Sequence, residues 1–394
     1  MHEAVIVDIL RTPMGKGKPG GALSGVHPVD LLASVMTDLV ERNKLDPGTI
    51  DDVLVGCVSQ VGEQSATPGR MAVLAAGFPT HVPATTIDRK CGSSQQALHF
   101  AAQGIMAGSY DIAIAGGVES MSRVRMGSAR LDADPYGAGV AEKWAPGLVS
   151  QGVAAELVAQ RWEISRQQMD EFAARSHELA ASASDSGAFD AEISAVATDA
   201  GRVIRDETIR PGTSVERLAE LDAVFQSDAI DARFPGLDWG VTAGNSSQIT
   251  DGASAALVMN RAVAERLGLK PRARFVAFDV IGDDPLLMLT APIEATRRVL
   301  AKAGLSLSDI DHFEVNEAFA SVPIAWAAEF DLNYERLNPH GGAIALGHPL
   351  GASGTRLLAT MQNRLERTGG RYGLQTMCEA GGMANATIIE NLVR

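Results

Sequence analysis

The stretch DIAIAGGVESMS at residues 111–122 is decisive for the fold, because an apolar run there leads directly into two glycines. The stretch LQTMCEAGGMANATI at residues 374–388 has the same arrangement near the other end of the chain. Apolar runs with little alternation are typical of strands that are covered on both faces. We therefore expect a buried strand and a Gly-Gly turn in each stretch, and their likeness is consistent with a duplicated α/β unit.

Further short β-branched runs alternate with helical patterns on both sides of these stretches, which is typical of α/β layers. Each end also has a strand followed by a helical pattern, CGSSQQALHFAAQGI from residue 91 and NEAFASVPIAWAAEF from residue 316. The predicted strands are Ala4–Ile9, Asp52–Gly56, Asp111–Ala115, Arg274–Asp279, His312–Asn316, Gly373–Cys378 and Ala386–Glu390.

The chain changes character roughly between residues 121 and 250, where Pro and Gly turns separate helices that do not alternate with strands. This block is expected to be an insertion. Its clearest helix begins after Ser165, because Ser165 and Gln168 form a capping-box pattern. Such a helix is a scaffold feature and carries no chemical information.

Composition limits the class of protein. The chain has 394 residues, 46% of them hydrophobic, which suggests two or three domains with a large core. Its net charge is −14, from 34 basic against 48 acidic residues, and no basic block stands out. A protein that lives on nucleic acid or on an anionic membrane is therefore disfavoured, and an anionic ligand would need a local basic patch.

The cellular compartment follows from the cysteines and the N-terminus. Three separated cysteines without a C-x-x-C pair do not form a disulfide framework, so a reducing compartment fits best. The first residues carry Glu3 in place of a basic leader, and no uninterrupted apolar run is long enough to span a membrane. We expect a cytoplasmic protein without membrane insertion.

Cys91 is the first candidate catalytic residue. An extended run ends near Ile87, and a helix is expected behind Ser93 and Ser94, which are plausible caps. The start of a helix favours a thiolate, the nucleophilic form of cysteine. The small polar neighbours favour exposure, whereas a lone cysteine is otherwise more often a buried core residue.

The other candidates lie in the second half of the chain. His348 stands in the glycine-rich segment NPHGGAIALGHPLGASG, where it can act as a base, hold an anion, or make a structural bond. Cys378 leaves a strand toward a Gly-Gly turn whose N–H groups can stabilise an oxyanion. Asn316 offers an amide after an apolar strand, and Glu317 can orient a neighbour or cap the next helix.

Taken in order, five motifs closely resemble the thiolase family of acetyl-CoA acetyl- and acyltransferases over essentially the whole chain. They are DRKCGSSQQA, TAGNSSQITDGAS, NEAFA, GGAIALGHPLGASG and the C-x-x-G-G turn. Within this family, the sequence is most similar to bacterial degradative thiolases, including steroid-catabolic members. The resemblance implies two similar α/β/α layered halves, from residues 1–120 with 251–270 and from 271–394, and an inserted CoA-binding loop domain at 121–250.

The resemblance implies the following roles. Cys91 attacks the keto carbon of a 3-oxoacyl-CoA and becomes an acyl thioester, His348 activates it, and Cys378 protonates the departing carbanion and then deprotonates CoA. Asn316 and His348 hold the enolate oxygen. The backbone N–H groups of Cys91 and Ala380 hold the tetrahedral oxyanion, although the family commonly has glycine at position 380. The third cysteine, Cys57, is most simply a core residue.

In the inserted block, the resemblance implies that Ser247 contacts the pantetheine arm, Arg210 lies near the CoA phosphates, and Phe319 forms a wall of the acyl tunnel. The segment GRVIRDETIRPG also gathers three arginines in an otherwise acidic chain. The chain departs from the family at His340, where asparagine is common. Ser150 and Gln151 occupy the place of a His-Met pair.

Thiolytic cleavage of 3-oxoacyl-CoA to acetyl-CoA or propionyl-CoA is the leading functional interpretation. The alternatives are biosynthetic acetoacetyl-CoA synthesis by the same steps, a β-ketoacyl synthase, a non-catalytic acyl-CoA-binding subunit, and redox regulation through Cys91 and Cys378. CoA is expected as a substrate, with no permanently bound cofactor and no metal. A homodimer or homotetramer without nucleic-acid partners is expected.

Overall fold

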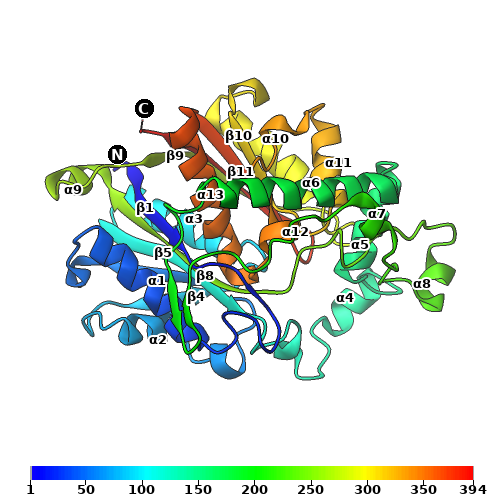
Figure 1. The fold of residues 1–394 in the computed structure, drawn as a ribbon, viewed down its shortest axis with the longest axis horizontal. Helices are drawn as coiled ribbons and strands as arrows, with labels where there is room; N and C mark the ends of the chain where they lie inside the picture. The colour runs from blue at the N-terminus through cyan, green and yellow to red at the C-terminus, as the bar shows by residue number, and fades with distance from the viewer. Residues whose placement is uncertain (1, 394) are drawn as a thin grey trace.

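The computed structural model describes residues 2–393 and is built around one ten-stranded mixed sheet (Figure 1). The strand order is β10-β11-β12-β9-β1-β8-β5-β3-β4, and the short β2 pairs with β8. The strands are β1 (Ala4–Arg11), β2 (Gly15–Lys16), β3 (Asp52–Gly56), β4 (Ala84–Ile87), β5 (Ile112–Ser120), β8 (Thr250–Asn260), β9 (Ala273–Gly282), β10 (His312–Val315), β11 (Tyr372–Glu379) and β12 (Met383–Asn391).

All seven predicted strands are present, and several extend beyond their predicted ends. The expectation of a turn at Gly116 and Gly117 is wrong, because both glycines lie inside β5, opposite Ala255 and Ser254 of β8. A Cβ on Gly117 would lie 2.0 Å from the carbonyl oxygen of Gly351. The glycines therefore permit a close backbone approach, which a sequence pattern does not distinguish from a turn.

The two halves of the sheet repeat one arrangement. In one half β3 is parallel to β5, and β5 and β1 are antiparallel to β8. In the other half β10 is parallel to β11, and β11 and β9 are antiparallel to β12. An antiparallel contact between β1 and β9 joins the halves. The strand order and directions support the duplicated α/β unit that the sequence predicted.

The principal helices form layers on this sheet. They are α1 (Pro28–Arg42), α2 (Pro68–Ala75), α3 (Ser93–Met106), α10 (Ala291–Ala303), α11 (Ser321–Glu329) and α13 (Ser353–Thr368). Helices α1 and α2 pack on one half, and α10 packs on the other. Helices α3 and α13 pack against each other and against strands of both halves, so they form the central layer. Their apolar faces bury Leu98, Ile105 and Met361 in one cluster with Ile6.

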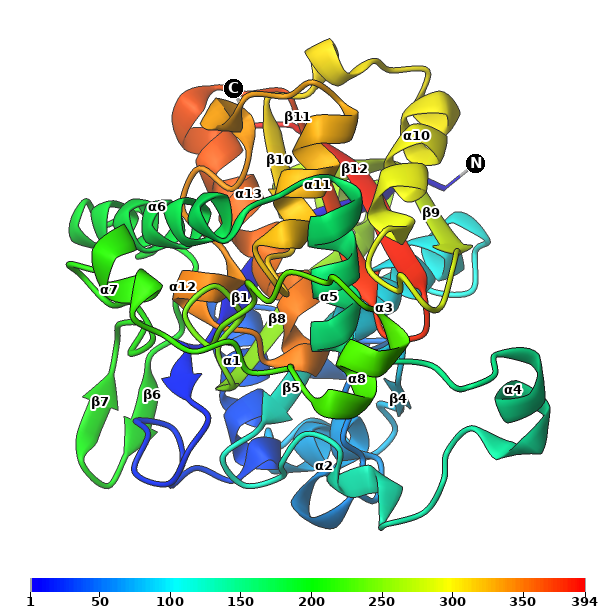
Figure 2. The same ribbon diagram turned by 90° about the vertical axis from the view of Figure 1, so that its right-hand side faces the viewer.

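Residues 121–249 contribute no strand to the main sheet. They form the hairpin β6 (Val196–Thr198) and β7 (Gly201–Val203), with α4 (Gly137–Lys143), α5 (Gln151–Arg161), α6 (Arg166–Asp185), α7 (Val215–Ala219) and α8 (Asp228–Arg233). Figure 2 shows that the α4 segment projects away from the body of the molecule. The predicted capping box is present at the start of α6, where the side chains of Ser165 and Gln168 each accept from the other residue's N–H.

The remaining helices are α9 (Arg261–Arg266) and α12 (Ala343–Leu346). Among the helices within residues 2–393, none combines the length and the apolar character needed to cross a membrane.

Candidate active site

Cys91 lies two residues before the first residue of α3. Only 4% of its surface is exposed, and Ser93 and Ser94 are fully buried. The expectation that these neighbours keep the cysteine exposed is therefore wrong. The expectation that they cap the helix is also wrong, because α3 has no side-chain cap and the Ser93 hydroxyl instead accepts from the N–H of Arg89 at 2.9 Å.

Burial determines the protonation state of Cys91. Loss of hydration, with a further contribution from the Glu379 carboxyl, raises the pKa of the Cys91 thiol to about 12. The backbone N–H groups of Cys91 and Ala380 act in the opposite direction without reversing the shift. The raised pKa therefore favours the neutral thiol in the free protein over the thiolate that the start of a helix would favour. The neutral thiol needs a base to become a nucleophile.

Cys378 lies on β11, one residue before its end, and 1% of its surface is exposed. Burial raises its pKa well above the ordinary value, and the charge of Cys91 raises it further. The two cysteines are thus close enough to influence each other's ionisation. Cys57, in contrast, is fully buried and fits the core position expected for it.

His348 and Asn316 form a buried pair, with 4% and 1% of their surfaces exposed. The Nδ2 atom of Asn316 lies 3.4 Å from the Nε2 atom of His348. The Nδ1 atom of His348 lies 2.6 Å from the Oγ atom of Ser353. Burial, with a contribution from the charge of Arg356, lowers the pKa of His348 to about 3. The imidazole is therefore neutral and able to accept a proton.

The topology explains why these residues meet. Asn316 directly follows β10, and Cys378 lies one residue before the end of its parallel neighbour β11, so both lie at the carboxyl edge of the sheet. The N–H of Asn316 donates to the carbonyl of Thr376 at 3.1 Å, which fixes the start of the loop. Leu350, two residues after His348, packs in one apolar cluster with Cys91 and the neighbour of Cys378, Met377.

Position 380 tolerates alanine for a conformational reason. Gly381 and Gly382 have φ angles of 95° and 78°, whereas Ala380 is not among the residues with positive φ. The two glycines that adopt left-handed backbone are thus retained, and the alanine carries no such strain. The Ala380 N–H acts to lower the pKa of the Cys91 thiol.

Glu119 connects two loops near the site, and no sequence motif pointed to it. Its carboxylate accepts from the backbone N–H groups of Val58 and Ser59 at 3.0 Å each, and from Gly351 at 2.9 Å. The amide of Gln64 adds a fourth bond at 2.8 Å. This network holds the segment after His348 against the end of β3.

Glu317 orients a loop and does not cap a helix, since α11 has no side-chain cap. Its carboxylate accepts from the Ser176 hydroxyl at 2.7 Å, the Asn338 amide at 2.9 Å and the Ile344 N–H at 3.1 Å. A Cβ on Gly342 would lie 2.3 Å from the carboxyl carbon. Glycine at this position therefore allows the glycine-rich segment to pack on Glu317.

Two of the residues predicted to contact CoA lie side by side. The N–H of Ser247 donates to the carbonyl of Ala318 at 2.9 Å, next to Phe319. Phe319 is buried and meets the Phe225 ring edge to face, with ring centroids 6.0 Å apart. Ser247 and Phe319 therefore lie on adjoining segments of the chain.

Arg210 is connected to the same region through Gln248, the residue after Ser247, which the sequence analysis did not single out. A guanidinium nitrogen of Arg210 donates to the side-chain oxygen of Gln248 at 3.1 Å. The Gln248 amide donates to the carbonyls of Thr208 and Ile344 at 2.9 Å each. The Gln248 carbonyl accepts from the N–H of His348 at 3.1 Å, so one residue links the arginine to the histidine loop.

The remaining departures from the family pattern lie elsewhere. His340 meets Phe189 edge to face at 5.9 Å, and burial lowers its pKa to about 3. Ser150 caps α5 by accepting from the N–H of Val153 at 3.4 Å, and Gln151 is the first residue of that helix. The residue at position 150 thus has a structural role.

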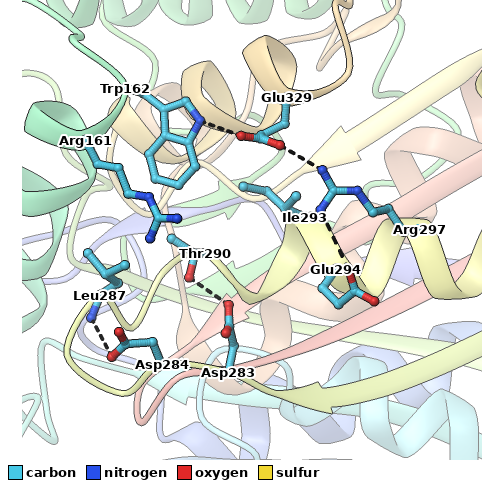
Figure 3. Close-up of a pocket in the computed structure, with 10 residues that line it drawn as sticks. All are labelled: Arg161, Trp162, Asp283, Asp284, Leu287, Thr290, Ile293, Glu294, Arg297 and Glu329. Atoms are coloured by element: carbon cyan, nitrogen blue, oxygen red, sulfur yellow. Dashed lines mark hydrogen bonds and ion pairs between the residues drawn. The ribbon is translucent and has the colours of Figure 1, made fainter.

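A surface pocket of about 270 Å³ lies between the end of α5 and the start of α10 (Figure 3). Its charged groups are largely paired with each other: Glu329 accepts from Trp162 at 3.0 Å and from Arg297 at 2.7 Å, and Thr290 donates to Asp283 at 2.8 Å. None of the candidate catalytic residues lines it. The pocket is therefore separate from the candidate active site.

Within the described part of the chain, no three or more His, Cys, Asp or Glu side chains are grouped so that they could hold a metal ion. The candidate site instead combines two thiols, a neutral imidazole, an amide and backbone N–H groups. Such a set supports covalent thioester chemistry with separate oxyanion sites.

Comparison with known proteins places this arrangement in context. Residues 4–262 match the family model described as "Thiolase, N-terminal domain", and residues 269–391 match "Thiolase, C-terminal domain". The chain is 45% identical to the steroid 3-ketoacyl-CoA thiolase FadA6 of Mycobacterium tuberculosis, across 100% of this chain and 95% of that protein. It is also 45% identical to a 3-ketoacyl-CoA thiolase of Erwinia tasmaniensis, with 100% of both chains covered.

A solved structure is similar as well. The crystal structure of the Bacillus anthracis acetyl-CoA acetyltransferase superposes with a TM-score of 0.87 at 36% sequence identity. The superposition covers 100% of this chain and 99% of that one.

Proposed function

The chain belongs to the thiolase family, and we propose that it cleaves 3-oxoacyl-CoA with CoA, using Cys91 as the nucleophile. The products are acetyl-CoA or propionyl-CoA and a shortened acyl-CoA. The observation that supports this proposal most strongly is the buried Asn316–His348 pair beside two cysteines that influence each other's ionisation. In this proposal His348 is the base, Asn316 is an oxyanion donor and Cys378 is the second acid.

The first step forms the acyl-enzyme. His348 accepts the Cys91 proton, and the sulfur attacks the keto carbon, whose oxygen becomes an alkoxide. The N–H groups of Cys91 and Ala380 stabilise that alkoxide, since they already favour negative charge at the Cys91 sulfur. The bond between C2 and C3 then breaks, and its electron pair forms the enolate of the leaving acetyl-CoA.

The enolate and its protonation require the other groups. Asn316 and the protonated His348 donate hydrogen bonds to the enolate oxygen, and Cys378 transfers its proton to C2. The Cys378 thiolate then takes the proton of the incoming CoA thiol. The CoA sulfur attacks the acyl thioester, Cys91 leaves, and the proton held by His348 returns to it. Protons and electrons therefore balance over the cycle.

Coenzyme A is the co-substrate in this proposal. Residues 121–250 form its binding domain, with Arg210 at the phosphates, Ser247 at the pantetheine arm and Phe319 along the acyl group. Two sets of bonds support this placement: Arg210 is linked through Gln248 to the N–H of His348, and the Ser247 N–H donates to the carbonyl of Ala318, beside Phe319. We also propose a cytoplasmic homodimer or homotetramer with no permanently bound cofactor.

Thiolysis of a panel of 3-oxoacyl-CoA substrates tests the proposal. The panel should run from acetoacetyl-CoA through longer linear chains to thioesters derived from steroid side chains or rings, because a 3-ketoacyl-CoA thiolase and a steroid 3-ketoacyl-CoA thiolase are both similar to this chain. We expect CoA-dependent loss of at least one substrate and none in Cys91→Ala. Absence of cleavage across the panel, or full activity of the variant, would refute the mechanism.

A further inference from the structure

The imidazole of His348 has a second neighbour, Ser353, that the proposed mechanism does not use. The Oγ atom of Ser353 lies 2.6 Å from Nδ1 of His348 and 2.9 Å from the carbonyl oxygen of Pro349. Ser353 is fully buried at the first residue of α13, so bulk water does not compete for these bonds. The contact is therefore part of the folded core.

Counting hydrogens assigns the direction of each bond. The Pro349 carbonyl is only an acceptor, so the hydrogen between the two oxygens comes from the Ser353 hydroxyl. The Ser353 oxygen is then left to accept, and the hydrogen between it and His348 belongs to Nδ1. A neutral imidazole with hydrogen on Nδ1 has its lone pair on Nε2, the nitrogen that faces the Asn316 amide donor at 3.4 Å.

We propose that Ser353 is a positioning residue that holds His348 in the tautomer with hydrogen on Nδ1 and an unprotonated Nε2. The inference rests on the proposed function, because only in that mechanism does Nε2 take the Cys91 proton. Without the hydroxyl, the imidazole would divide between two tautomers and two ring orientations, and only one combination could act as the base.

The type of partner also has a chemical consequence. Hydrolase triads place a carboxylate at the corresponding nitrogen, and its charge stabilises the imidazolium. Ser353 is neutral, and the positive Arg356 lies near enough to disfavour charge on His348. The site thus fixes the orientation of the base without stabilising its protonated form, which favours return of the proton from His348 to Cys91 when Cys91 leaves.

The variant Ser353→Ala tests this role, with Ser254→Ala as the matched control. Ser254 is also fully buried, and its hydroxyl donates to the Ala352 carbonyl at 2.7 Å, on the same loop but without contact to His348. We expect Ser353→Ala to lower kcat of thiolysis about tenfold or more and Ser254→Ala to change it less than about threefold. Ser353→Thr, which restores the hydroxyl, should recover most of the lost activity.

Two readouts separate this inference from the proposed function. Ring-¹⁵N spectra, with the His348 signals identified by their absence in His348→Asn, should show hydrogen on Nδ1 alone in the wild type and a tautomer mixture in Ser353→Ala. The rate of iodoacetamide reaction at Cys91 should also fall in Ser353→Ala. These results need no substrate. Hydrogen on Nε2 in the wild type, or unchanged tautomer and alkylation rate in Ser353→Ala, would overturn the inference.

Discussion

The side-chain amide of Asn316 lies 3.4 Å from the Nε2 atom of His348, in a region where both residues are almost completely buried. The Oδ1 atom of Asn316 has no hydrogen-bond partner among the described residues. A buried, unpartnered amide oxygen beside a neutral imidazole is unfavourable for stability alone. It is consistent with a pair arranged to contact a bound substrate.

Replacing Asn316 with alanine is therefore expected to affect the chemical step. Loss of one oxyanion donor typically lowers kcat by about 100- to 1000-fold, and KM for the 3-oxoacyl-CoA should change little. Steady-state thiolysis measures both values. As a control, Asn43→Ala removes an amide that binds the Asp8 carboxylate at 2.8 Å, outside the site, and should leave kcat unchanged. An equal loss in both variants would contradict the assigned role.

The two cysteines should differ in the half-reaction that they support. Cys378→Ala retains Cys91 and should still accept an acyl group from a donor thioester, which mass spectrometry of the intact protein detects. It should not cleave the C2–C3 bond, because no acid remains to protonate the enolate. Cys91→Ala should do neither. Normal turnover of Cys378→Ala would contradict its role as the second acid and base.

Arg210 should influence CoA affinity more than chemistry. Its guanidinium is exposed and pairs with Gln248, so Arg210→Ala should raise KM for CoA by about three- to tenfold with little change in kcat. The increase should be smaller for 3′-dephospho-CoA if the guanidinium serves the 3′-phosphate. Arg202→Ala, an exposed arginine of the same segment, is the control. A fall in kcat alone would place Arg210 outside the CoA site.

Much of this site could be predicted from the sequence, because the relevant residues lie in motifs bounded by glycine. The strands and the capping box of α6 follow from local patterns, whereas the grouping of Asn316 with His348 was implied by the resemblance to the thiolase family. The protonation state of Cys91 was not predictable, because burial comes from Leu350 and Met377, which are far away in sequence. Glu119 has no local signature, since its partners Val58 and Gly351 meet only in three dimensions.

His99 offers a test of how burial acts on stability. Its ring stacks on Phe278 with centroids 5.0 Å apart and lies 2.7 Å from the Thr387 hydroxyl, and burial lowers its pKa to about 3 from an ordinary value of 6.5. Below pH 6.5 the unfolded chain therefore binds a proton that the folded chain does not. The contribution of His99 to the free energy of unfolding is fully present above pH 6.5. As the pH falls from 6.5 toward 3, this contribution decreases by about 1.4 kcal/mol per pH unit.

The variant His99→Gln lacks this titration. It should be less stable than the wild type at pH 8, because the stacked ring is lost, and the difference should narrow as the pH falls from about 6 to about 4. Urea unfolding at a series of pH values measures the free energy of each protein. A difference that stays constant, or widens toward low pH, would show that the pKa of His99 is not lowered in the folded protein.

Gly354 controls the contact between the two central helices. A Cβ at this position would lie 2.3 Å from the backbone nitrogen of Gln95 on α3. Backbone cannot move aside as a flexible side chain can, so Gly354→Ala must separate α3 from α13. Cys91 lies two residues before α3, and Ser353 is the first residue of α13. We expect a loss of about 1 to 3 kcal/mol in the free energy of unfolding. A fall in kcat should accompany it.

The matched control is Gly139→Ala. Gly139 lies in α4 with no atom within 4 Å of the added Cβ and no positive φ, so alanine there should be neutral or slightly stabilising. Comparing the two variants separates the general effect of replacing a helical glycine from the effect of helix separation. If Gly354→Ala also proved neutral in stability and activity, the close approach of α3 and α13 would not be what positions Cys91 relative to His348.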